Sequence, residues 1–182
     1  MTKVFVGGSR RISRLNAEIR NRLDRVVDAG FKIIVGDANG ADKAVQIYLQ
    51  SKCYDAVEVF CAGHACRNNV GNWPTRKVAA DKLRGFDFYA EKDRVMADEA
   101  SYGLMIWDGE SIGTLMNVVR LLGKKKPAAV FVSKAKEFVD LHNPDEFRHF
   151  LNDHAPEIQP ELESRATSEL SLLKRRSQMS LL

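Results

Sequence analysis

The segment from Gly36 to Asp42, which reads Gly-Asp-Ala-Asn-Gly-Ala-Asp, constrains the fold of this chain more than any other. It follows directly on an apolar run at 31–35 and precedes a helix-forming run at 43–47. A buried strand therefore ends in a loop of small residues that opens a helix. Glycine lets backbone N–H groups approach a ligand closely, and a helix start adds unpaired N–H groups and the positive end of the dipole. The pattern predicts an anion site, although a tight turn whose aspartate caps the helix would give the same sequence.

The same strand–loop–helix arrangement occurs at two further places. An apolar strand at 4–6 runs into Gly7-Gly8-Ser9-Arg10, and a strand at 102–107 runs into a loop that ends in Gly113-Thr114. Repeated units of this kind predict a parallel sheet, in which ligands bind beyond the carboxyl ends of the strands. We therefore expect an α/β, Rossmann-like three-layer sandwich with a mainly parallel sheet of five or more strands, whose three loops converge on one crevice.

Hydrophobic periodicity divides the rest of the chain into strands and helices. Strands are expected at 3–7, 31–36, 56–61, 102–107 and 128–132, and helices at 14–29, 40–51, 91–100, 111–123 and 144–154. The polar stretch from 62 to 85 shows no clear period. Pro156 and Pro160 mark a boundary, so we expect a domain over 1–155 and an amphipathic helical tail over 156–182. The apolar residues of that tail recur at helical spacing: Leu162, Ala166, Leu170 and Leu173.

Composition agrees with a single globular domain. The 182 residues are 45% hydrophobic and 29% charged, and the net charge of +4 fits an anionic ligand or weak, nonspecific contact with nucleic acid. No apolar run is long enough to span a bilayer, and the chain enters a predicted strand directly after Met1-Thr2-Lys3, so we expect no signal peptide. Three cysteines are few and odd in number, which favours reduced thiols in the cytoplasm over a disulfide framework.

The glycine loops together resemble the SLOG superfamily, which joins the Smf/DprA DNA-processing proteins to the Lonely Guy (LOG) enzymes. The resemblance covers about residues 3–133 and is greatest to the YspA/YpsA-related branch. It implies a Rossmann-like fold that binds nucleotides or nucleotide-derived ligands. By matching position, it implies a ligand-binding crevice formed by Gly7, Gly8, Ser9, Arg10, Gly36, Asp37, Asn39, Gly40, Asp42, Lys92, Ser111, Gly113, Thr114 and Asn117.

Two positions depart from the LOG signature. Asn117 stands where the resemblance places a catalytic glutamate, and Lys92-Asp93 stands where it places an arginine–lysine pair before a methionine, here Met96. An amide cannot act as a carboxylate base or stabilise an oxocarbenium-like centre by its charge. These departures argue against the LOG phosphoribohydrolase reaction and leave the question of an enzyme open. Glu110 and Asp93, with Asp108, are candidate substitute carboxylates whose placement the sequence does not determine.

The stretch after 60 holds further polar residues. Cys61, His64 and Cys66 are three potential metal ligands within six residues, but zinc usually takes four ligands from two separated pairs. We therefore expect no metal site, and no cofactor. Trp73 and the polar residues around it could form a lid over the crevice, with the indole stacked on a base, or the indole could simply pack at the surface.

We expect a domain that binds a nucleotide or nucleotide derivative, with a sensing or regulatory role. The alternative is a hydrolase or transferase acting on the N-glycosidic bond of a nucleotide, like a phosphoribohydrolase or deoxyribosyltransferase, and Asn117 favours the first reading. A third reading is a nucleic-acid-associated domain, but the sequence lacks a dense basic face with interleaved aromatic residues. The expected partner is thus a nucleotide-type small molecule, and neither nucleic acid nor a membrane.

The apolar stripe of the tail bears on assembly. A short helix with such a stripe is seldom stable alone in water, so it must dock on its own domain or on a second subunit. LOG-like proteins are commonly dimers, and the resemblance therefore implies a homodimer or a higher homo-oligomer, with the tail adding to the contact.

Overall fold

The computed structural model describes residues 1–80 and 83–179, the last ten of them by their backbone alone. Seven strands form one sheet: β1 (Lys3–Gly8), β2 (Lys32–Gly36), β3 (Val57–Ala62), β4 (Thr75–Val78), β5 (Tyr102–Trp107), β6 (Ala128–Val132) and β7 (Glu137–Leu141). Their order across the sheet is β4-β3-β2-β1-β5-β6-β7, and only the pairing of β6 with β7 is antiparallel within the described residues. The mainly parallel, Rossmann-like sheet expected from the sequence is therefore confirmed.

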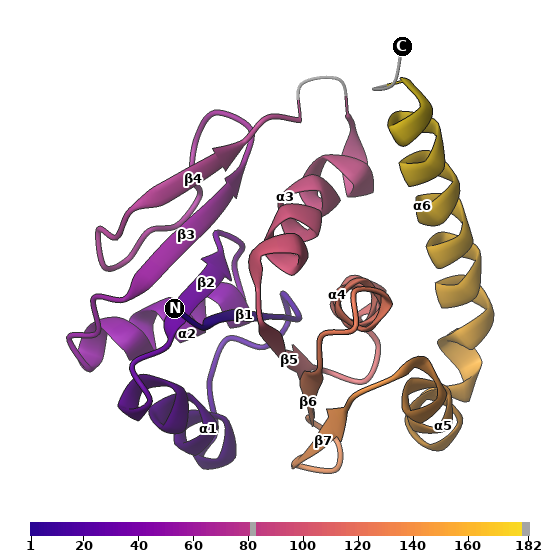
Figure 1. Cartoon of the computed structure of the whole chain (residues 1–182). Helices are drawn as coiled ribbons and strands as arrows, with labels where there is room; N and C mark the ends of the chain where they lie inside the picture. The colour runs from indigo at the N-terminus through magenta and orange to yellow at the C-terminus, as the bar shows by residue number, and fades with distance from the viewer. Residues whose placement is uncertain (81–82, 180–182) are drawn as a thin grey trace.

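Helices cover both faces of the sheet (Figure 1). They are α1 (Ala17–Asp28), α2 (Ala41–Ser51), α3 (Gly85–Glu99), α4 (Ile112–Gly123), α5 (Pro144–His154), the 3-10 turn η1 (Pro156–Ile158) and α6 (Gln159–Met179). Helices α1 and α2 lie on one face, and α3 and α4 lie on the other, with α5 and α6 outside α4. This is the three-layer sandwich that the strand–helix alternation predicts.

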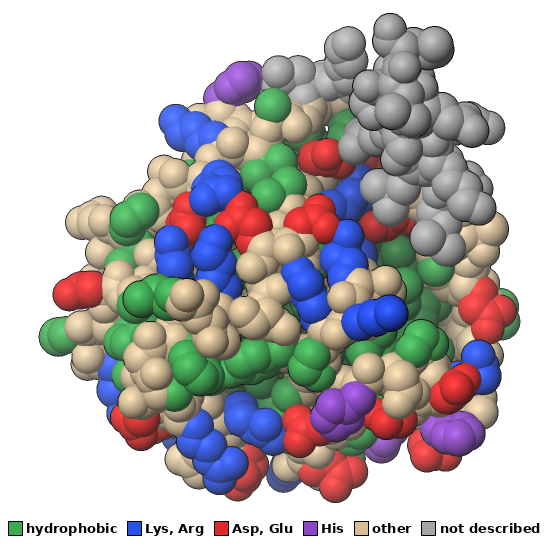
Figure 2. Space-filling view, in the orientation of Figure 1, with side chains coloured by type: hydrophobic (Ala, Val, Ile, Leu, Met, Phe, Trp, Pro, Cys, Tyr) green, Lys and Arg blue, Asp and Glu red, His purple; other side chains and the backbone are tan. Residues whose placement is uncertain are grey.

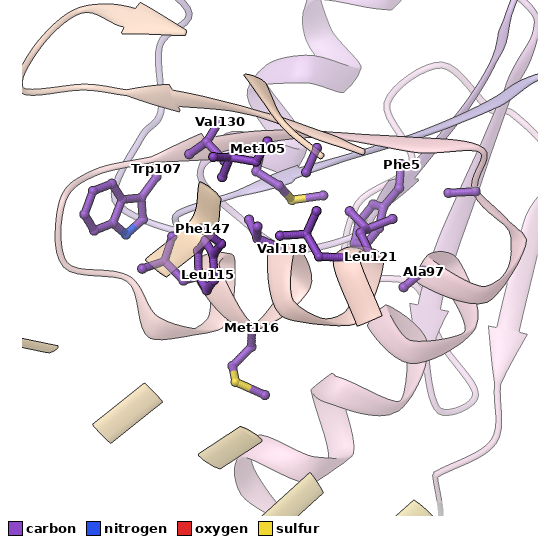
Figure 3. Packing of buried hydrophobic residues seen from close by; sticks show 14 of the residues in the cluster. Phe5, Ala97, Met105, Trp107, Leu115, Met116, Val118, Leu121, Val130 and Phe147 are labelled. Carbon is purple, nitrogen blue, oxygen red and sulfur yellow. The ribbon is translucent and has the colours of Figure 1, made fainter. Parts of the chain in front are cut away.

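Alternation along the strands divides the core into two clusters. In β1, Val4 and Val6 pack with α1 and α2, whereas Phe5 between them packs with α3 and α4. Successive strand residues point to opposite faces of a sheet, so both faces of β1 are apolar and buried. On the α4 face, Figure 3 shows Leu115 and Leu121 directed at the sheet. The continuous apolar runs in the sequence thus reflect strands covered on both sides.

Two strands and the start of one helix differ from the sequence-based expectation. The edge strands β4 and β7 were not predicted, because their sequences, Thr-Arg-Lys-Val and Glu-Phe-Val-Asp-Leu, mix polar and apolar residues as exposed edges do. Helix α3 begins at Gly85, six residues before the expected start at 91, so the apparently irregular stretch from 62 to 85 holds β4 and leads directly into α3.

The cysteines also differ from expectation. Cys61 and Cys66 form a disulfide, while Cys53 is exposed and outside it. The expectation of three reduced thiols was wrong because the pairing depends on how the chain turns after β3, which spacing alone does not show. Both sulfurs are consumed by this bond, so neither is free to ligate a metal. No helix in the described part of the chain has the length and apolar character needed to cross a membrane.

The polar residues around Trp73 do not form a lid. The Trp73 indole is buried in the core cluster beside α1 and α2, and its Nε1 donates to the backbone oxygen of Tyr54 at 2.9 Å. Asn69 holds the same turn by hydrogen bonds to the backbone of Trp73. The indole therefore packs into the core, where the sequence had suggested either a lid or packing at the surface.

Charges at the amino ends of the central strands are paired with one another. Glu58 pairs with Lys32 at 2.7 Å and with Arg76 at 3.2 Å, and Glu99 pairs with Arg76 and with Lys3. The space-filling view shows acidic and basic side chains close together across the middle of this face (Figure 2). These cations are thus engaged with carboxylates of the same fold.

Helix α6 docks on its own domain. Leu162 is buried in the core cluster formed by α4 and α5, and Ala166 packs against the same cluster. Leu170 and Leu173, the remaining residues of the expected stripe, lie outside the described side chains. At least the first half of the tail stripe is therefore satisfied within one chain.

Candidate functional site

A crevice lies beyond the carboxyl ends of β1 and β5. The chain runs from β1 outward to β4 on one side and from β5 outward to β7 on the other, so this is the point where the strand order reverses. The cavity there has a volume of about 470 Å³. Its lining combines the loop after β1, the loop after β5, the first turn of α4, one face of α3 and a residue of α6.

Ser9 joins three elements at the floor of the crevice. Its backbone N–H donates to the backbone oxygen of Ile106 at 2.9 Å, and its backbone oxygen accepts from the N–H of Ala41 at 3.0 Å. Its hydroxyl donates to the carboxylate of Asp108 at 2.6 Å. Burial alone would raise the pKa of Asp108, but hydrogen bonds from the Ser9 hydroxyl and from backbone N–H groups, those of Glu110 and Ser111 among them, outweigh it and lower that pKa. Ser9 is thus held as part of the scaffold that binds β1 to β5 and α2.

Gly40 fixes the second loop against the first. It stands at the N-cap of α2 with φ +83, a conformation that L side chains rarely adopt, and a Cβ there would overlap the backbone of Arg10. Gly8 is equally tight, since a Cβ on it would overlap Ile106 and Ala41. These glycines are required because backbones of different loops meet at close range.

Asp37 is bound by the loop that follows the disulfide. The guanidinium of Arg67 donates to both carboxylate oxygens of Asp37, at 2.6 and 3.2 Å, and the Arg67 N–H donates at 3.0 Å. The side-chain amide of Asn68 also donates to the backbone oxygen of Asp37 and to the side-chain oxygen of Asn39. Burial would raise the pKa of Asp37, but the bonds and charge of Arg67 lower it overall. The carboxylate is therefore ionised and occupied by protein groups.

A chain of paired charged groups lines the floor of the crevice. Lys92 on α3 donates to Asp93 at 2.7 Å and lies near Asp42, while Asn117 on α4 bridges Asp93 and Arg120. Burial would lower the pKa of Lys92, but the two carboxylates raise it overall. Burial also raises the pKa of Asp42 to about 6, against the opposing effect of Lys92. Lys92 is thus the buried cation that compensates two acids, and all three side chains line the crevice.

Arginine and aromatic side chains meet at the rim. The guanidinium carbons of Arg10 and Arg67 lie 4.8 and 4.6 Å from the centre of the Tyr89 ring, and that of Arg165 lies 4.8 Å from the centre of the Phe86 ring. Phe86 and Tyr89 are three residues apart on α3, so they share one face of the helix. The crevice consequently has a cationic and aromatic upper wall above a floor of paired charges.

The structure brings most of the sequence-predicted residues to this cavity. The residues that line it are Gly7, Gly8, Ser9, Arg10, Asp42, Lys92, Ser111, Gly113, Thr114 and Asn117, together with both candidate carboxylates, Asp93 and Glu110. Gly36, Asp37, Asn39 and Gly40 are outside its recorded lining and support it from behind. Glu110 is exposed and paired with Arg11, and Asp93 is paired with Lys92, so each candidate carboxylate already has a partner.

Sequence reasoning missed the aromatic and arginine residues of the rim. Phe86 and Tyr89 precede the expected start of α3 at 91, Arg67 lies in the stretch judged irregular, and Arg165 lies in the tail excluded from the resemblance. The one available signal was the spacing of Phe86 and Tyr89, which suits a shared helix face once the helix is extended to Gly85.

Among solved structures, DNA processing protein A from Helicobacter pylori has a similar fold, and that structure is described for its unique single-stranded DNA binding mode. The alignment has a TM-score of 0.57 and 15% sequence identity, and it covers 93% of this chain and 80% of that chain. At this identity the likeness shows the fold, in agreement with the Smf/DprA side of the SLOG resemblance. No protein-family model matches the chain, and no curated protein matches it.

This neighbour corrects two expectations. The nucleotide-sensing role, with its hydrolase or transferase alternative, was wrong, and so were the partners expected with it, a nucleotide-type small molecule and no nucleic acid, because the protein that shares this fold binds single-stranded DNA. The physical reason lies in how the basic surface was judged. A run of cations and aromatic residues was sought along the sequence, whereas Arg10, Arg67, Tyr89 and Arg165 come together only in the folded chain.

Proposed function

We propose that this protein binds single-stranded DNA in the crevice between β1 and β5. The observation that carries the proposal is the cluster of Arg10, Tyr89 and Arg67 at the rim, together with the likeness in fold to DNA processing protein A. Proteins that bind single strands combine a positively charged groove with aromatic rings on which bases stack. The rim of this crevice has both kinds of group within one cavity.

Bases would stack at Tyr89. Base–aromatic stacking is worth about 1–3 kcal/mol per base and tolerates any sequence, because every base has a π-face. Arg10 is exposed and can leave the ring to pair with a phosphate. Arg67 is held by Asp37 at 2.6 Å and would keep its place beside the ring. Tyr89 is thus the stacking surface, with a movable and a fixed cation beside it.

Phosphates would bind at the first turn of α4. Ser111, Gly113 and Thr114 line the cavity there, and the side chain of the N-cap residue Ser111 makes no capping bond, while the Asp108 carboxylate accepts from the Ser111 N–H at 2.8 Å. A helix N-terminus offers backbone N–H groups and a positive dipole end to an anion. A Cβ at Gly113 would meet only the Phe86 ring, at 3.9 Å, so the backbone here has few close neighbours. This turn and the rim arginines together would follow a strand across the crevice.

Within this fold, we place the chain in the YspA/YpsA-related branch, on the three glycine loops that carry the resemblance. The replacement of the LOG glutamate by Asn117 supports a binding role, because Asn117 accepts a hydrogen bond from Arg120 at 2.5 Å and spans two charged groups. Its amide serves the chain of paired charged groups and leaves no carboxylate at that position.

Fluorescence anisotropy with a labelled oligothymidylate of about 20 nucleotides tests the proposal, with the corresponding duplex as comparison. We expect the single strand to bind more tightly than the duplex, and the affinity to fall as salt rises from about 50 to about 200 mM. Tyr89→Ala should weaken binding at least about fivefold through lost stacking, and Tyr89→Phe should retain it.

Arg148→Ala is the matched control, because Arg148 is an exposed arginine on α5 that pairs with Asp145 outside the crevice lining. Its affinity should equal that of the wild type. Absence of binding at tens of micromolar protein in low salt would overturn the proposal. Equal affinity of the wild type and Tyr89→Ala would remove the crevice as the binding site.

A further inference from the structure

We infer that α6 completes the single-strand interface, with Phe86 and Arg165 forming a second base-stacking and phosphate-binding position that the buried Glu169 holds in place. This inference rests on the proposed function. It gives the C-terminal helix a direct part in binding, although that helix lies outside the part of the chain that carries the SLOG resemblance.

The Phe86–Arg165 pair has the composition of a single-strand contact. Phe86 is 41% exposed, which is unusual for a large apolar side chain, and it lies in the first turn of α3. The guanidinium carbon of Arg165 is 4.8 Å from the ring centre, and both residues line the crevice. An exposed ring with a cation beside it offers one face to a base and a charge to the adjoining phosphate.

The pair continues the Tyr89 position. Phe86 and Tyr89 are one turn apart on the same face of α3, and each has an arginine from another segment over its ring. Arg10 comes from the loop after β1, and Arg165 comes from α6. Two aromatic–arginine positions in line along one helix suit successive nucleotides of one strand better than a single compact ligand.

Glu169 anchors the part of α6 that carries Arg165, whose own guanidinium donates to Glu161 on the same helix at 2.7 Å. Glu169 is four residues further along α6 than Arg165, on the same side of the helix, and it is 7% exposed. Its carboxylate accepts from Arg120 on α4 at 2.7 and 2.6 Å, and it pairs with Arg94 on α3 at 3.2 Å. Burial would raise its pKa, but Arg120 and Arg94 lower it overall. Glu169 therefore joins α6 to both helices that border the crevice.

This ion pair adds a directional contact to the apolar packing of α6. Leu162 and Ala166 pack one side of the helix against the core, and the hydrophobic effect that stabilises this contact is non-directional. A buried, two-armed arginine–carboxylate pair has one favourable geometry, and loss of one partner leaves uncompensated charge. Glu169 is thus a positioning residue that acts on DNA through Arg165.

The test is the salt dependence of oligothymidylate binding in the full chain. Each phosphate contact to a single strand contributes a slope of about 0.7 in the logarithm of affinity against the logarithm of salt. We expect Arg165→Ala to reduce the slope by about this amount, and Arg165→Lys to retain it. Phe86→Ala should weaken binding at least about fivefold with an unchanged slope, because stacking releases no counterions.

Glu169→Gln tests the positioning role by a double-mutant comparison with Arg165→Ala. We expect each single variant to weaken binding, and the double variant to be no weaker than Arg165→Ala alone, since Glu169 acts through Arg165. Arg148→Ala again serves as the control for lost surface charge. Circular dichroism of each variant verifies that the fold is kept.

The outcomes separate the two proposals. If the wild type does not bind the oligonucleotide, the proposed function itself fails. If the wild type binds through Tyr89 and the slope of Arg165→Ala is unchanged, the function stands and α6 has no part in it. Should Glu169→Gln fail to fold, Arg165→Ala and Phe86→Ala still decide the question, because both replace exposed or half-exposed side chains.

Discussion

At the scale of single residues, the polar groups that the glycine loops predict for a ligand serve mainly to build the crevice. Ser9 bonds to Asp108, and Asp37 is enclosed by Arg67. Gly40 makes room for the backbone of Arg10. A small-residue loop therefore has two uses that look alike in sequence, namely approach to a ligand and approach to another loop. The groups left to face a ligand are the cations and rings of the rim.

Gly40 and Gly113 should respond oppositely to alanine. A Cβ at Gly40 would overlap the backbone of Arg10 at a φ of +83, whereas Gly113 lies within α4 with only Phe86 near it, at 3.9 Å. We expect Gly40→Ala to lower the free energy of unfolding by about 2 kcal/mol or more. Gly113→Ala should be neutral or stabilising, since alanine favours a helix. Thermal denaturation of both variants measures this, and equal losses would contradict the close approach at Gly40.

The second prediction at this scale concerns pH. Burial raises the pKa of Asp42 to about 6 from its ordinary value of 3.8. Between these values the folded protein holds a proton that the unfolded chain has released, so this residue contributes stability at low pH that is lost as pH rises through about 6. The effect is on the order of 3 kcal/mol. The raised pKa of Lys92 matters only above its ordinary value of 10.5, outside this window.

Asp42→Asn isolates that contribution. The amide can still accept the hydrogen bond that the N–H of Ala38 makes to Asp42 at 3.3 Å. Relative to the wild type, we expect the variant to gain several degrees in melting temperature on going from about pH 4 to about pH 8. Calorimetric melting at both ends of the range measures it. Parallel profiles for the two proteins would show that Asp42 ionises freely in the fold.

At the scale of helices and strands, the sequence predicted the elements whose residues are apolar on both sides. β1, β2, β3, β5 and β6 all have continuous buried runs, and each was found within one or two residues of its expected bounds. β4 and β7 lie at the edges of the sheet and alternate with charged residues, so no periodic signal distinguished them from loops. The sequence therefore predicted those strands that are buried on both faces of the sheet.

The same limit explains which part of the site was predictable. The loops after β1, β2 and β5 were found because glycine at a strand end is a local signal. The rim was not, because Arg67, Tyr89 and Arg165 are far apart in sequence and none stands in a motif. Long-range proximity of single side chains depends on the order of strands in the sheet, which no local pattern contains.

The disulfide loop should be a separate contributor to stability. Cys61 and Cys66 close a short loop directly before Arg67, which binds Asp37. Closing a loop of this length restricts the unfolded chain by about 2 kcal/mol. In a Cys53→Ser background, which removes the exposed thiol, we expect dithiothreitol to lower the melting temperature by several degrees.

Cys66→Ser in that background provides the control, since it has no bond to reduce. It should melt at the reduced temperature whether or not reductant is present. Reduction that leaves the melting temperature of the Cys53→Ser protein unchanged would show that Cys61 and Cys66 are not joined in solution.

At the scale of the whole molecule, the two ends of the sheet differ in what surrounds their charges. The amino ends of the strands hold the ion pairs of Glu58 and Glu99, whereas the carboxyl ends face a rim where Arg10 and Arg165 lie over aromatic rings. The crevice itself is lined by both cations and carboxylates. What distinguishes the carboxyl ends is therefore the combination of arginines with aromatic rings in one cavity.

The last prediction is assembly. The SLOG resemblance leads us to expect a homodimer, and twofold dimers are the commonest assemblies of single chains. Leu162 and Glu169 contact their own domain, so these two tail residues are not available for contacts with a second subunit. A chain ending at Ala155 would lose both and leave the buried Arg120 without its carboxylate, so we expect it to melt at a much lower temperature. Light scattering of the full chain at tens of micromolar should give twice the monomer mass. A monomer there would contradict the dimer, and a shortened chain that stays dimeric would confine the tail to contacts within its own subunit.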